Sequence, residues 1–161
     1  IAAGSQPNVA RFVAFDVSST SILYGGLEPG QSLSTATTTD IISQGNTGLD
    51  QTLYGDTMCT DWADLDSCDD LGIAPTREIP ATTTQKVATS SHIWSHPEMF
   101  LVGASTSPFG FQIRVPKTTV TSTPQTKYNY WNIEIPTAIT LAGSYSGQMV
   151  ITGIQSDAAF W

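Results

Sequence analysis

Apolar and polar residues alternate along the stretch Lys127–Ile135. The apolar side chains of Trp131, Ile133 and Ile135 face away from the polar or amphipathic residues between them. This period of two predicts a β-strand with one apolar face. Pro136 ends the run, because proline has no backbone N–H to donate to a neighbouring strand. A second β-favouring run, Gln148–Ile154, predicts the last strand of the chain.

A corner separates these two predicted strands. The stretch Leu141–Gly147 contains two glycines, which permit a tight bend, and Tyr145 lies between them. A tyrosine at such a corner pins the bend by packing its ring and by a hydroxyl hydrogen bond, an arrangement typical of β-sandwiches. We therefore predict a tyrosine corner before the last strand.

Further β-favouring runs precede this pair. They are Val9–Val17, Ser21–Tyr24, Thr37–Ser43, Leu49–Gly55, Ala81–Ala88, Glu98–Val102 and Phe109–Val115. Turn signals separate them: Pro29-Gly30 predicts a type II turn, and Gly45–Gly48 predicts a hairpin-type loop. Because no helical periodicity competes with this pattern, the sequence predicts an all-β protein, an antiparallel β-sandwich of about eight strands.

The length of 161 residues and the hydrophobic share of 40% predict one domain, residues 1–161, with a buried core. Three parts lie outside the predicted strands: an N-terminal extension, residues 1–8, an irregular loop, residues 56–80, and a C-terminal tail, residues 155–161. The loop is longer than most connections, which favours a functional or specially stabilised segment.

The first predicted strand is apolar on both faces. Val9, Val13, Phe15 and Val17 fall on one face, and Phe12 lies between two alanines on the other. An edge strand of a monomer normally has one wet face, so this strand is either buried on both sides or meets another subunit. The terminal pair Phe160 and Trp161 is a second apolar group, at a place that normally frays, and we expect it to dock on this chain or on a neighbour.

The charge balance excludes two classes of partner. The formal net charge is −8, whereas nucleic acids and anionic membrane surfaces attract basic patches. No apolar run reaches the roughly 18 residues of a membrane-spanning helix. We therefore expect no nucleic-acid partner and no transmembrane segment.

Two cysteines, Cys59 and Cys68, flank a polar loop. In an oxidising compartment they would form a disulfide worth roughly 2–3 kcal/mol, and the Ser/Thr-rich, Lys-poor composition favours such a compartment. Two free thiols or half of a metal site are the alternatives. We predict the disulfide, in a protein that is secreted or displayed at the cell surface.

The same loop is acidic. Calcium is bound by six to eight oxygen atoms, which carboxylates and carbonyls of a flexible loop supply. The candidate calcium ligands are Asp61, Asp64, Asp66, Asp69 and Asp70. Their spacing is not that of an EF-hand, and the alternative is a solvated acidic loop without metal.

His92, His96 and Glu98 raise the question of zinc. Two histidines four residues apart need a helix to place both rings on one side. Pro97 and the β-rich surroundings oppose a helix, so we expect surface or packing histidines.

Neither a Gly-x-Ser-x-Gly motif nor a glycine-rich phosphate loop occurs in the sequence, and we expect no enzymatic activity.

Three parts of the sequence carry a family resemblance: Ser21–Ser32, Ser43–Asp50, and Tyr130–Pro136 with the corner that follows. They resemble immunoglobulin-like sandwich domains of bacterial and archaeal secreted cell-surface or filament-forming proteins, over roughly residues 12–154. The resemblance implies an immunoglobulin-like fold and an extracellular structural or adhesive module without catalysis; a jelly-roll arrangement stays open. Leu141, where proline is commoner, and the acidic insertion between the cysteines depart from the pattern.

Two functions follow as expectations. The first is an extracellular structural subunit that polymerises with copies of itself into a filament, pilus or surface assembly by strand exchange or complementation. Val9, Phe12, Val13, Phe15 and Val17 are the expected contact residues, with Phe160 and Trp161 as secondary candidates. The alternative is a monomeric secreted adhesin module that binds carbohydrate or a receptor with the help of calcium.

Overall fold

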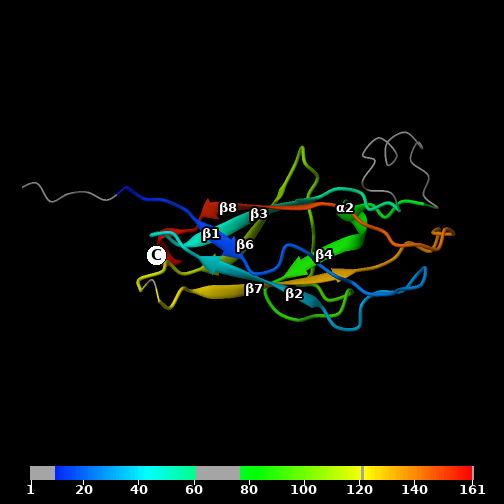
Figure 1. Ribbon diagram of the computed structural model, residues 1–161, viewed down its shortest axis with the longest axis horizontal. Coiled ribbons are helices and arrows are strands. Elements are labelled where there is room, and N and C mark those ends of the chain that lie inside the picture. Colours follow the sequence, from blue (N-terminus) through cyan, green and yellow to red (C-terminus); the bar gives the residue numbers. More distant parts are fainter. Residues whose placement is uncertain (1–9, 61–76, 121, 161) are drawn as a thin grey trace, which may run out of the picture.

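The computed structural model describes residues 10–60, 77–120 and 122–160 of the chain (Figure 1). The strands are β1 Phe15–Val17, β2 Thr37–Ser43, β3 Leu49–Gly55, β4 Gln85–Ala88, β5 Phe100–Leu101, β6 Phe109–Val115, β7 Thr126–Ile133 and β8 Met149–Gln155. A single helical turn, α2 Ala81–Thr84, and a 3-10 helix, η1 Ala158–Phe160, complete the elements. Within the described ranges, no helix has the length and apolar character needed to cross a membrane.

The strands form two antiparallel sheets. One has five strands in the order β1-β2-β7-β4-β5, and the other has three in the order β6-β3-β8. In Figure 1 the layer that contains β3 and β8 lies above the layer that contains β2, β7 and β4. This arrangement confirms the predicted all-β antiparallel sandwich of about eight strands.

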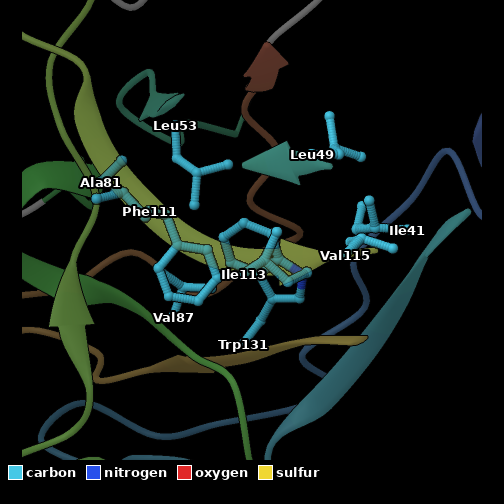
Figure 2. Packing of buried hydrophobic residues seen from close by; sticks show 10 residues of the cluster. Ile41, Leu49, Leu53, Ala81, Val87, Phe111, Ile113, Val115 and Trp131 are labelled. Atoms are coloured by element: carbon cyan, nitrogen blue, oxygen red, sulfur yellow. The ribbon is translucent and has the colours of Figure 1, made fainter. Parts of the chain in front are cut away.

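The core lies between the two sheets because their inward faces are apolar. Ile41 of β2, Val87 of β4 and Trp131 of β7 come from the five-stranded sheet. The three-stranded sheet contributes Leu49, Leu53, Phe111, Ile113 and Val115. Figure 2 shows Trp131 reaching from β7 towards Ile113, with Val87 and Phe111 beside it. Trp131 is the largest of the fully buried side chains among the described residues, and its ring packs in the core between the layers.

Hydrogen-bonded polar groups are buried in the same core. The Trp131 indole N–H donates to Thr39 Oγ1 over 2.9 Å, and Asn129 of β7 donates to Gln51 Oε1 of β3, also over 2.9 Å. The second bond joins the two sheets directly. The alternation places Asn132 on a polar outer face, but its side chain is fully buried as well. Loops cover it, and its amide group donates to the carbonyls of Leu33 and His92 in these loops.

Two sequence predictions fail locally. The run Ala81–Ala88 begins with the helical turn α2 instead of a strand; the backbone amide and the hydroxyl of Thr84 both donate to the carbonyl of Pro80. The Gly45–Gly48 loop does not close a hairpin, because β2 and β3 belong to different sheets. Asn46 instead binds the incoming chain, accepting from the Phe12 amide at 2.8 Å and donating to the Ala10 carbonyl at 2.9 Å.

The turn at Pro29-Gly30 forms as predicted. The Gln31 amide donates to the Glu28 carbonyl over 2.9 Å, and Gly30 has a φ of 80°. A positive φ at the third residue is what a type II turn requires, and glycine adopts it without strain.

Candidate functional site

The stretch Ser21–Tyr24, predicted as a strand, belongs to neither sheet. Its side chains still alternate as they do in a strand: Ile22 and Tyr24 pack against the core, whereas Leu23 is 77% exposed. The backbone of residues 22–27 makes no hydrogen bond to the backbone of any other described residue. The predicted strand is wrong for the chain alone, because a strand needs a hydrogen-bonded neighbour.

An apolar groove runs beside this stretch. It consists of two adjoining cavities of about 860 and 450 Å³, between residues 17–29 on one side and residues 139–151 on the other. Five residues line both cavities, which makes them one continuous groove: Ile22, Leu23, Tyr24, Met58 and Tyr145. A second buried cluster, Ile79, Ile133 and Ile139, lies beneath the larger cavity. No local sequence pattern predicts this groove, because residues that are distant in sequence form it.

Strand β8 borders the groove and is an edge strand. It pairs with β3 on one side and ends the three-stranded sheet. Met149 and Ile151 line the smaller cavity and are only partly buried, whereas Leu49 and Leu53 of β3 are fully buried. An edge strand presents unpaired backbone N–H and C=O groups on which another strand can pair. The groove therefore combines apolar side chains with an open sheet edge.

The predicted tyrosine corner forms one wall of the groove. The Tyr145 hydroxyl donates to the Leu141 carbonyl over 2.8 Å. Cys59 and Ser146 exchange two backbone hydrogen bonds of 2.9 Å, and Gly147 lies so close to Met58 that a Cβ on it would be 2.8 Å from Met58 Cγ. These contacts hold this wall in place in the chain alone.

Tyr24 fixes the opposite wall. Its hydroxyl donates to Gln85 Oε1 of β4 over 3.0 Å, and burial raises the pKa of this hydroxyl above its ordinary value. The neighbouring Gly25 has a φ of 74°, a conformation that non-glycine residues rarely adopt. The side chains of this stretch are thus anchored to the core while its backbone stays unpaired.

The predicted contact strand Val9–Val17 is a strand only over β1, Phe15–Val17, which pairs with β2. Phe15 and Val17 pack against the core of their own chain; the Phe15 ring lies against Gly153 of β8. Phe12 and Val13 are 51% and 37% exposed. Val9 and Trp161 lie outside the described residues, and Phe160 is the last residue of η1.

The larger cavity of the groove and the start of the described chain lie towards opposite ends of the sandwich (Figure 1). The dark-blue N-terminal segment and the red C-terminal end lie at the left. The blue segment that follows β1 and the orange segment that follows β7, which contain the groove walls, lie at the right. The described chain therefore starts at the other end of the sandwich from the larger cavity, whereas the smaller cavity reaches back to Val17 of β1.

The acidic loop is described only at its base. Met58 and Ile79 exchange backbone hydrogen bonds of 2.9 and 3.0 Å across it, and Cys59 is buried. The described part of the chain contains no free cysteine. The predicted partner, Cys68, and the calcium candidates Asp61, Asp64, Asp66, Asp69 and Asp70 lie outside the described residues, so disulfide and calcium stay predictions.

The structure brings His92, His96 and Glu98 together without a helix. Their potential ligand atoms all lie within 4.8 Å of one another. The two imidazole rings stack with centroids 3.7 Å apart and planes 2° apart, and His92 Nε2 lies 3.0 Å from Glu98 Oε2. The argument that this pair needs a helix is wrong here, because the irregular chain between β4 and β5 folds back on itself. The turn-forming Pro97 between His96 and Glu98 was the available sequence signal.

Comparisons of the chain with models of known protein families, with curated proteins and with solved structures find no match.

Proposed function

We propose that this chain is an extracellular structural subunit that polymerises head to tail into a filament by strand complementation. One observation carries the proposal: the strand-like stretch Ser21–Tyr24 lines an apolar groove, and the backbone of residues 22–27 makes no hydrogen bond to the backbone of any other described residue. In this proposal the neighbour is a strand from the next subunit.

Strand addition would satisfy two needs of the groove at once. An inserted strand would pair with the unpaired backbone of residues 22–27 or with the open edge of β8. Its alternate side chains would cover Leu23 and the partly buried Met149 and Ile151. Full burial of an exposed apolar side chain contributes about 1.5–3 kcal/mol. The gain is smaller for the partly buried Met149 and Ile151, and together these gains offset the entropy lost on association.

The donor we propose is the N-terminal segment, residues 1–9, with Phe12 and Val13 covered at the joint. Its sequence carries Ile1, two alanines and Val9, with Gly4, Pro7 and three polar residues between them. Nine extended residues span roughly 30 Å, more than the roughly 23 Å of a seven-residue strand. Because the donor of one subunit would enter the groove of the next, two different surfaces meet, and such a heterologous contact builds an open fibre when it does not close into a ring.

The finer class that we assign is an immunoglobulin-like sandwich of a secreted or cell-surface assembly. The two antiparallel sheets and the tyrosine corner support this class. No catalytic step is part of the proposal. The monomeric adhesin that binds carbohydrate or a receptor is the outcome to which failed assembly would point.

Blocking the groove is the first test. Leu23→Asp places a charge in both cavities, where an inserted strand would bury it at a cost of several kcal/mol. Since Leu23 is exposed in the chain alone, we expect its thermal unfolding to change little. Val120→Asp is the matched control: Val120 is 53% exposed and lines neither cavity.

Negative-stain electron microscopy of concentrated protein distinguishes the outcomes. We expect fibres from the unmodified chain and from Val120→Asp, and single particles from Leu23→Asp. Fibres of normal length from Leu23→Asp would show that the groove is not the joint. A monomeric unmodified chain at every concentration would reject the filament and favour the adhesin.

A further inference from the structure

We propose that His92, His96 and Glu98 form a binding site for a divalent transition metal of the zinc class. Each residue offers one ligand atom, and these atoms lie within 4.8 Å of one another. Two ligands of one tetrahedral zinc lie roughly 3.3 Å apart, since zinc–nitrogen and zinc–oxygen bonds are near 2.0–2.1 Å. The potential ligand atoms are thus at most about 1.5 Å farther apart than the ligand atoms of one tetrahedral zinc. Side-chain rotation covers this difference.

The backbone of this loop is held from below. Asn132, fully buried in β7, donates to the His92 carbonyl over 3.2 Å. The His96 amide donates to the Ile93 carbonyl at 3.0 Å, and the amide of the buried Met99 donates to the His96 carbonyl at 3.1 Å. These bonds fix the two histidines and limit the entropy that metal binding must remove.

Lys86 holds the middle of the same loop. Its ammonium group donates to the Trp94 carbonyl over 3.0 Å and lies 4.3 Å from the centroid of the Trp94 ring. Because Lys86 belongs to β4, the loop that carries the ligands is tied to the five-stranded sheet at a second point.

The ligand types select the metal. Two imidazoles and one carboxylate suit zinc and its neighbours, whereas calcium and magnesium require oxygen ligands. His92 Nε2 already lies 3.0 Å from Glu98 Oε2 and 2.8 Å from Ser90 Oγ, so polar atoms converge where the metal would bind. The stacked rings must rotate apart for both nitrogens to reach one ion. Three protein ligands leave a fourth position for water or a group from another molecule.

This site is separate from the groove. None of its three residues lines either cavity, and it lies between β4 and β5, where β5 is the far edge strand from β1. It is also distinct from the acidic loop, whose carboxylates favour calcium. Metal binding can therefore be tested whether or not the chain assembles.

The test is isothermal titration calorimetry of the full chain with Zn²⁺ in the presence of excess Ca²⁺, which occupies sites made of oxygen alone. Co²⁺ replaces Zn²⁺ in a parallel titration, because its visible absorption reports a tetrahedral shell. The variants are His92→Ala, His96→Ala and Glu98→Gln. Asp157→Asn is the matched control, because Asp157 is an exposed carboxylate that lines neither cavity, and circular dichroism checks that each variant is folded.

We expect one Zn²⁺ per chain and a Co²⁺ spectrum of tetrahedral intensity. Each histidine variant should lose more than about a hundredfold in affinity, since even outer-shell partners of a metal are worth roughly 10–100-fold. Glu98→Gln should weaken binding, and Asp157→Asn should leave it unchanged. The proposal would be overturned if the unmodified chain formed no 1:1 complex with Zn²⁺. It would also be overturned if folded His92→Ala and His96→Ala bound Zn²⁺ as tightly as the unmodified chain does.

Discussion

We expect a chain that lacks residues 1–8 to fold normally and to form no fibres. The sandwich core is built from Phe15 onward, so the deletion leaves the described packing intact. The same deletion removes most of the proposed donor segment. Circular dichroism and thermal unfolding should match the full chain in its monomeric form, while electron microscopy should show single particles only.

A peptide added in trans is the control for this deletion. A synthetic peptide of residues 1–13 should bind the empty groove of the truncated chain and raise its melting temperature, because a ligand that binds only the folded state stabilises it by an amount that grows with the logarithm of the ligand concentration relative to Kd. A scrambled peptide of the same composition should have no effect. Normal fibres from the truncated chain would assign the donor role to another segment.

We expect Trp131→Ala to lower the free energy of unfolding by about 3–5 kcal/mol, the usual cost of truncating a large buried aromatic residue. Trp131 is fully buried and packs between the two sheets (Figure 2). The substitution also leaves Thr39 Oγ1, a buried hydroxyl, without its indole donor. Urea unfolding followed by circular dichroism measures the change in free energy.

Trp131→Phe separates the two contributions. It keeps an aromatic ring in the core but removes the hydrogen bond to Thr39, so its cost should be clearly smaller than that of Trp131→Ala. A loss below about 1 kcal/mol for Trp131→Ala would show that the ring does not carry the contact between the sheets.

The sequence predicted best those strands whose side chains alternate within a single run. Thr37–Ser43, Leu49–Gly55 and Phe109–Val115 have the predicted bounds, because one apolar face of each packs on the core. The Leu141–Tyr145 corner and its hydroxyl bond also formed as predicted. In these places local pattern and tertiary packing agree.

Predictions failed where the partner of a segment is distant in sequence. Ser21–Tyr24 has the alternation of a strand but no pairing neighbour among the described residues. The Gly45–Gly48 loop has the composition of a hairpin but joins two different sheets. Neither local propensity nor turn chemistry states which strands pair, so sequence patterns alone do not determine these features.

The two candidate sites were hidden for the same reason. The groove draws its walls from residues 17–29 and 139–151, and the ligands at His92, His96 and Glu98 converge through an irregular loop. The i, i+4 rule for histidine pairs assumes a helix and gives the wrong answer for a loop that folds back.

The most direct measurement of head-to-tail complementation mixes two chains that each lack one half of the joint. The chain without residues 1–8 keeps its groove, and Leu23→Asp keeps its donor segment. By size-exclusion chromatography with light scattering, we expect each to be monomeric alone and the mixture to form a 1:1 dimer that grows no further. A mixture that stays monomeric while both chains are folded would contradict the account, as would larger oligomers from either chain alone.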